Sequence, residues 1–265
     1  MDKKTDYIFS INTGRSGSDY LANILNHISG CRSFHEPKPV GNGQAMIRYS
    51  RGNLEPMRKL AKKKAQIIKQ LKSEHQVYVE TNHCFIKGFG WFIPQYLPED
   101  RIGVIILKRE KSKIAKSLLR IGCSPLKRFG RDWISTPEMK DPLTTPPKLL
   151  ISPKVTYQYA RFAKLMLRGN KGLVRNVFKQ DFKYPQWLID YELECLQWYV
   201  EEIHKKTTAF KQKYPKIKYY ETNIEDLNSL ESVQQMIAYF GLHPKPSLMD
   251  VVGKPTNLKL LQLRN

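Results

Sequence analysis

The sequence predicts an α/β protein whose central parallel sheet is flanked by helices on both faces. Two observations support this: short apolar segments of strand length recur along the chain, and segments with helical spacing of apolar residues separate them. A helix between two strands returns the chain to the same end of the sheet, which makes the strands parallel. The hydrophobic content is 41% of 265 residues, so residues 1–265 are expected to form one domain.

Five strands are expected, and the later part of the chain is mostly helical. Segment 102–107 (IGVIIL) is apolar without interruption, as is typical of a parallel strand buried on both faces. The expected strands are 7–12, 32–35, 76–80, 102–107 and 217–221. The expected helices are 19–28, 54–73, 111–119, 155–167, 189–210 and 230–240.

Segment 122–153 interrupts the alternation of strands and helices, because it carries six prolines. Long irregular segments in compact enzymes often cover or bind a substrate. A lid or an acceptor-binding loop is therefore one interpretation of this segment, and a plain surface excursion is the other.

The chain is strongly basic: Lys and Arg number 45 and Asp and Glu 24, which gives a net charge of +21. Such an excess attracts anionic partners, among them nucleic acids, nucleotides, acidic glycans and acidic membrane faces. Part of it is interpreted as a solvated helix face, because the run 58–64 (RKLAKKK) lies on an expected amphipathic helix whose buried side carries Leu60, Ile67, Ile68 and Leu71. A dedicated binding patch is the alternative. A nucleic-acid-binding module remains a hypothesis, but no known motif supports it, so no specific nucleic acid is predicted.

The cysteines and the N-terminal residues indicate the cellular compartment to expect. Cys31, Cys84, Cys123 and Cys195 are widely spaced and have no histidines at metal-ligand spacing, so they predict free thiols and no metal site. The first residues (MDKKTDYIFSIN) lack the pattern of a signal peptide, and no window is apolar enough to span a bilayer. A cytoplasmic protein without a membrane span is expected, whose oligomeric state the sequence leaves open.

A glycine-bearing turn follows the first expected strand and opens the first expected helix. Such a turn directs backbone N–H groups and the positive end of the helix toward one point, which suits a phosphate. It lacks the GxxxxGK[ST] pattern of NTPases, which argues against ATP hydrolysis, and an ordinary helix-capping turn is the alternative. We term this segment the glycine loop: Thr13, Gly14, Arg15, Ser16, Gly17 and Ser18.

A second phosphate contact is predicted after the strand 102–107. Arg109 follows that strand, and Ser117 lies eight residues later on the next helix. Eight residues are about two helical turns, so both side chains share one face and can grip one phosphate. A surface arginine and an unrelated serine are the alternative.

On these two motifs the sequence resembles the sulfotransferases that use 3′-phosphoadenosine-5′-phosphosulfate (PAPS), closer to their carbohydrate and tyrosine branch. The resemblance implies a three-layer fold like that of P-loop nucleotide kinases. It implies that the glycine loop, with the core Arg15 to Ser18, binds the 5′-phosphosulfate and that Arg109 and Ser117 bind the 3′-phosphate. The tail residues Lys254, Thr256 and Asn257 stand where relatives fold a basic loop over the nucleotide.

The general base has three candidates. Glu36 follows the second expected strand and corresponds to the base of the carbohydrate branch, so it is preferred. His83 is the rival, because the small-molecule branch carries Lys-Thr-His where this chain has Thr81-Asn82-His83. His35 is the third. Arg15 is expected to stabilise the charge that develops on the leaving phosphate.

The expected reaction is sulfuryl transfer from PAPS to a hydroxyl group, with no metal. The acceptor is predicted to be a carbohydrate, because the chain is basic and carries tryptophans that can stack on sugar rings. A small alcohol or phenol is the alternative acceptor. A nucleotide or small-molecule kinase with a degenerate phosphate loop is a further hypothesis, marked by dependence on ATP and magnesium.

Overall fold

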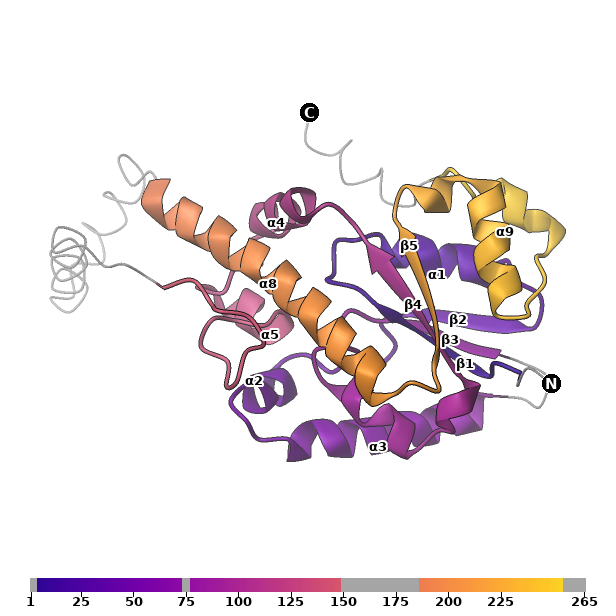
Figure 1. Cartoon of the computed structure of the whole chain (residues 1–265), viewed down its shortest axis with the longest axis horizontal. Helices are drawn as coiled ribbons and strands as arrows, with labels where there is room; N and C mark the ends of the chain where they lie inside the picture. Colours follow the sequence, from indigo (N-terminus) through magenta and orange to yellow (C-terminus); the bar gives the residue numbers. More distant parts are fainter. Residues whose placement is uncertain (1–3, 73–76, 149–185, 255–265) are drawn as a thin grey trace, which may run out of the picture.

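The computed structural model describes residues 4–72, 77–148 and 186–254. Its centre is a five-stranded sheet in the order β2-β3-β1-β4-β5, in which every neighbouring pair is parallel (Figure 1). The predicted α/β class is therefore confirmed, and each expected strand lies within two residues of an observed one. The strands are β1 (Tyr7–Ile11), β2 (Cys31–His35), β3 (Val77–Thr81), β4 (Ile102–Lys108) and β5 (Lys218–Asn223).

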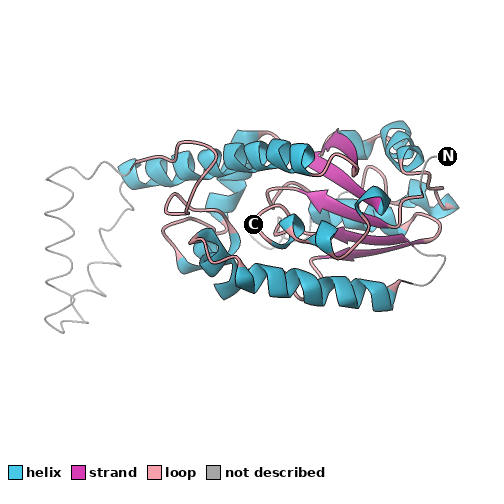
Figure 2. Cartoon of the chain, turned by 60° about the horizontal axis from the view of Figure 1, so that its bottom comes forward, coloured by secondary structure: helices cyan, strands magenta, loops and turns pink. Residues whose placement is uncertain are grey.

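Helices cover both faces of this sheet, as Figure 2 shows. Alternate residues of β1 point to opposite faces, so Phe9 packs with α3 and α8 while Ile8 packs with α1 and α9. Two apolar cores result, one on each side. The helices are α1 (Ser18–Asn26), α2 (Gln44–Ser50), α3 (Glu55–Leu71), α4 (Lys111–Arg120), α5 (Arg128–Trp133), α8 (Gln186–Lys213) and α9 (Leu230–Tyr239). Short 3₁₀ turns occupy Phe89–Trp91, Ile93–Gln95, Glu99–Arg101, Asp226–Asn228 and Pro246–Asp250.

Two short helices, α2 and α5, were not predicted. They lie in Gly- and Pro-rich stretches whose local sequence does not favour helix, and contacts between distant segments hold them. The Gly43 N–H at the start of α2 donates to the Asp132 carbonyl of α5 at 2.9 Å. Gly130 of α5 is required because a Cβ there would lie 1.8 Å from the Ser124 carbonyl oxygen. The helix expected at 155–167 and the end of segment 122–153 lie outside the described residues.

The prediction that the whole basic run of α3 faces water is wrong at Lys64. This side chain is 2% exposed and forms an ion pair with Glu80 of β3, with Nζ and Oε1 2.6 Å apart. Lys64 also donates to the Pro37 carbonyl at 3.1 Å, and Asn82 Nδ2 donates to Glu80 Oε1 and to the Val40 carbonyl. This buried cluster fastens the segment after β2 to the end of β3.

Within the described ranges, none of the helices combines the length and the apolar character needed to cross a membrane.

Candidate active site

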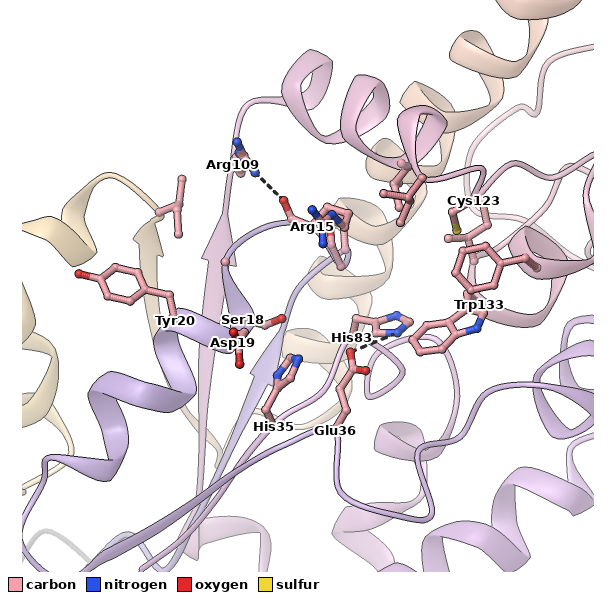
Figure 3. A pocket seen from close by; sticks show the side chains of 18 residues that line it. Arg15, Ser18, Asp19, Tyr20, His35, Glu36, His83, Arg109, Cys123 and Trp133 are labelled. Atoms are coloured by element: carbon pink, nitrogen blue, oxygen red, sulfur yellow. Dashed lines mark hydrogen bonds and ion pairs between the residues drawn. The ribbon is translucent and has the colours of Figure 1, made fainter. Parts of the chain in front are cut away.

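A cavity of about 770 Å³ opens at the carboxyl edge of the sheet. It is lined by the glycine loop after β1, by His35 and Glu36 at the end of β2, by His83 after β3 and by Arg109 after β4 (Figure 3). In open parallel sheets, ligands bind at this edge because successive strands deliver their following residues to the same place. The structure thus brings together residues that are far apart in the sequence.

The backbone of the glycine loop adopts a left-handed conformation that favours glycine. The φ angles of Gly14, Arg15 and Gly17 are 74°, 55° and 91°, all in the left-handed region. The Gly14 N–H donates to Asn12 Oδ1 at 3.0 Å, which holds the turn. Gly17 is the N-cap of α1 and supplies no side-chain hydrogen bond, so the first turn of this nine-residue helix is not capped by a side chain. Such an end attracts anions.

Arg109 and Ser117 both contact Arg15 of the glycine loop. Arg15 Nε donates to Ser117 Oγ at 3.2 Å, and Arg109 Nη1 donates to the Arg15 carbonyl at 2.7 Å. Both arginines line the cavity, whereas Ser117 is not part of its lining. Two cationic side chains and the helix end therefore concentrate positive potential at one side of the cavity.

Only some of the remaining residues predicted to bind the nucleotide line the cavity. The side chains of Thr13 and Ser18 are buried, and both residues line the cavity. Ser16 is fully buried and does not line it, and its hydroxyl has no hydrogen-bond partner among the described residues. Lys254 is exposed outside the cavity lining. Thr256 and Asn257 lie outside the described residues.

Glu36 and His83, predicted as rival bases, face each other across the opposite side of the cavity. His83 Nε2 lies 3.3 Å from Glu36 Oε1, and these side chains are only 5% and 20% exposed. The Glu36 N–H donates to the Thr81 carbonyl at 3.0 Å, which fixes its backbone at a φ of 46°. His35, the third candidate, lines the same cavity, and its Nδ1 lies 3.0 Å from Thr81 Oγ1.

Burial shifts the pKa values of both Glu36 and His83. It raises the pKa of Glu36 above its ordinary value, and electrostatic interactions with His35 and Lys87 oppose that rise. Burial also lowers the pKa of His83 well below its ordinary value, and Lys87 and His35 lower it further. A neutral imidazole beside a carboxyl group of raised pKa is an arrangement suited to proton transfer near neutral pH.

Three further residues surround His83: Lys87 and Tyr199, which the sequence analysis did not single out, and Trp133, one of the tryptophans expected to stack on a ring. Trp133 of α5 stacks on the imidazole, with ring centroids 4.8 Å apart and an interplanar angle of 12°. Lys87 is 1% exposed and contacts His83 Nδ1, and Tyr199 of α8 lies behind Lys87. A single lysine within the apolar stretch 84–93 was the available signal for Lys87, whereas Tyr199 gave none.

The cavity also has an apolar wall. Phe129 lies 5.7 Å from Trp133 between ring centroids, and both rings line the cavity. Phe129 and Ile121 are 44% and 45% exposed, which is unusual for large apolar side chains. This wall adjoins the Glu36–His83 pair, so an apolar group bound there would place its substituents beside the carboxylate.

Among residues 4–72, 77–148 and 186–254, no group of three His, Cys, Asp or Glu side chains is arranged to hold a metal ion.

Comparisons with known proteins add little to this geometry. No protein-family model matches the sequence. No curated protein matches it either. Among solved structures, a sulfotransferase from Alicyclobacillus acidocaldarius is similar at 11% sequence identity and a TM-score of 0.41, covering 94% of this chain and 89% of that one. The function of this chain is therefore argued from its own residues.

The geometry at Gly17 predicts a specific loss of stability. In Gly17→Ala the added Cβ would lie 1.9 Å from Ile224 Cδ1, and an alanine at a φ of 91° adds strain of about 1–2 kcal/mol. We expect a lower free energy of unfolding in urea, restored only in part by Ile224→Ala. Gly241→Ala is the control, because Gly241 follows α9 with a φ of 71° and no atom lies within 4 Å of the new Cβ. Equal losses in Gly17→Ala and Gly241→Ala would contradict the close approach.

Proposed function

We propose that this chain transfers the sulfuryl group of PAPS to a hydroxyl acceptor. The observation that carries the proposal is the meeting, in one cavity, of a phosphate-binding loop with two arginines and a buried carboxylate–imidazole pair. The first set suits a doubly phosphorylated nucleotide, and the second suits removal of a proton from an alcohol.

The proposed donor site uses the glycine loop for the 5′-phosphosulfate and Arg109 with Ser117 for the 3′-phosphate. Arg109 has five N–H donors and uses Nη1 on the Arg15 carbonyl. Ser117 accepts from Arg15 and keeps its own hydroxyl proton to donate. Both can therefore hold an anion while they anchor the loop. Arginine also pairs with a phosphate through two parallel hydrogen bonds.

The proposed chemistry is an in-line displacement at sulfur. The acceptor oxygen forms a bond to sulfur, the bond from sulfur to the bridging phosphate oxygen breaks, and 3′-phosphoadenosine-5′-phosphate leaves. The acceptor proton passes to Glu36. Arg15 and the N-terminus of α1 stabilise the negative charge that gathers on the bridging oxygen.

The acceptor is proposed to be a carbohydrate hydroxyl, as the basic charge and a stacking tryptophan suggest. A small aromatic alcohol is the second candidate, because Phe129 and Ile121 make the wall beside Glu36 apolar. Sulfation of 4-nitrophenol but not of sugars by the same preparation would select the second candidate.

Selective binding of the 3′-phosphate tests the donor site. We expect calorimetric titration to give a dissociation constant on the order of micromolar for 3′-phosphoadenosine-5′-phosphate, with weaker binding of AMP. Loss of a charge-assisted hydrogen bond costs about 1.5–3 kcal/mol, so Arg109→Ala should weaken binding roughly 10- to 150-fold. Arg120→Ala, an exposed arginine on the same helix as Ser117, is the control. Equal affinity for AMP, or binding only of ATP with magnesium, would contradict the proposal.

The assignment of Glu36 as the base predicts a pH dependence. Its carboxylate must be ionised to accept a proton, so the value of kcat/KM should fall as pH decreases through the pKa of Glu36, which burial raises. Glu36→Gln should lower the rate by about 10²- to 10⁴-fold, the usual contribution of a general base. A variant Glu36→Gln that keeps the rate, together with loss of activity in His83→Gln, would assign the base to His83.

A further inference from the structure

Lys87 is a buried lysine for which the proposed chemistry has no role. Its side chain is 1% exposed, and its ammonium group has no carboxylate in hydrogen-bond contact among the described residues. Nζ lies 2.5 Å from the Trp133 carbonyl oxygen and 3.2 Å from the Tyr199 hydroxyl, and it contacts His83 Nδ1. Burial of a charged group is costly unless every hydrogen-bonding position is used.

All three partners of Lys87 act as acceptors. The Trp133 carbonyl can only accept. The Tyr199 hydroxyl donates its proton to the Thr13 carbonyl at 2.6 Å, so its oxygen accepts from Lys87. An ammonium group has three N–H donors, which leaves the third for His83 Nδ1.

This arrangement determines where the proton of His83 sits. A neutral imidazole carries one N–H, and Nδ1 accepts from Lys87, so the proton is on Nε2. Nε2 faces Glu36 Oε1 at 3.3 Å and therefore donates to it. The lone pair of a ring nitrogen that already carries a proton belongs to the π system, so Nε2 cannot accept a proton from an acceptor hydroxyl. Protonation at Nδ1 would charge the ring, and burial opposes that charge.

We propose that Lys87 is a positioning residue that fixes the Nε2–H tautomer of His83, so that Glu36 is left as the proton acceptor of the pair. The role of Glu36 as proton acceptor rests on the proposed function. The tautomer of His83 does not, and it can be measured without a substrate.

The charged and titratable groups around Lys87 come from every element packed on it. They are Cys84 on its own segment, Glu36 after β2, Cys123 after α4, and Tyr199 and Lys206 on α8. Loss of the lysine charge removes a repulsion that lowers the pKa of His83, so that pKa should rise. The neighbouring Glu36 carboxylate would then stabilise an imidazolium.

The experiment is long-range ¹H–¹⁵N NMR of the full chain labelled with ¹⁵N-histidine, with the His83 signals assigned by their loss in His83→Gln. In the wild type we expect one Nε2–H tautomer that does not titrate between about pH 6 and 8, since its pKa lies below the ordinary value. An Nδ1–H tautomer in the wild type would overturn the proposal. This measurement needs no variant to fold.

Lys87→Met keeps the length of the side chain and removes its three donors. We expect His83 to show mixed tautomers or to become protonated at a higher pH than in the wild type. Lys206→Met is the matched control, because Lys206 is also largely buried but contacts Glu202 and not His83. Unchanged His83 signals in a folded Lys87→Met variant would overturn the proposal. Titration with 3′-phosphoadenosine-5′-phosphate tests the proposed function separately, so the two can fail independently.

Discussion

Parallel pairing of the strands is the constraint on which the candidate site depends. β1 lies between β3 and β4, with Tyr7 aligned to Tyr78 on one side and to Ile102 on the other. β2 joins β3 in the same direction, which aligns His35 with Thr81. Four strands therefore end at one edge, and the residues that follow them meet there. Reversal of any one strand would carry its functional residues to the far end of the sheet.

Buried polar contacts then fix the positions of the side chains at that edge. Glu80 accepts from Lys64, Tyr78 and Asn82 inside the sheet, and this cluster holds the segment that presents Glu36. Lys87 contacts Nδ1 of His83 and so holds the imidazole that faces the Glu36 carboxylate. Each lysine is buried at a cost in desolvation that the hydrogen bonds offset. Hydrogen bonds in such a buried polar network fix the orientation and protonation of the site side chains, which apolar contacts could not do.

Local sequence patterns predicted the parts of this arrangement that local physics determines. The continuous apolar run of β4 and the glycine turn after β1 have signatures within a few residues, and both were found. Arg109 and Ser117, for which the spacing predicts a shared face, each contact Arg15 of this turn, and Arg109 precedes the first residue of α4. The bounds of the helices were less accurate because fraying and capping depend on neighbouring segments.

The features that sequence reasoning missed depend on contacts between distant segments. The helical pattern predicts Lys64 on a solvated face, yet its side chain is buried against Glu80, 16 residues away. Glu36 and His83 were treated as alternatives, and the fold makes them partners. Tyr199 reaches the glycine loop across 186 residues, which no local pattern could indicate.

The most direct test of the account is a crystal structure of the protein with bound 3′-phosphoadenosine-5′-phosphate. We expect the 5′-phosphate against the glycine loop and Arg15, the 3′-phosphate within hydrogen-bond distance of Arg109 and Ser117, and open space between the 5′-phosphate and Glu36. A nucleotide bound elsewhere, or one whose 3′-phosphate points away from Arg109, would contradict it.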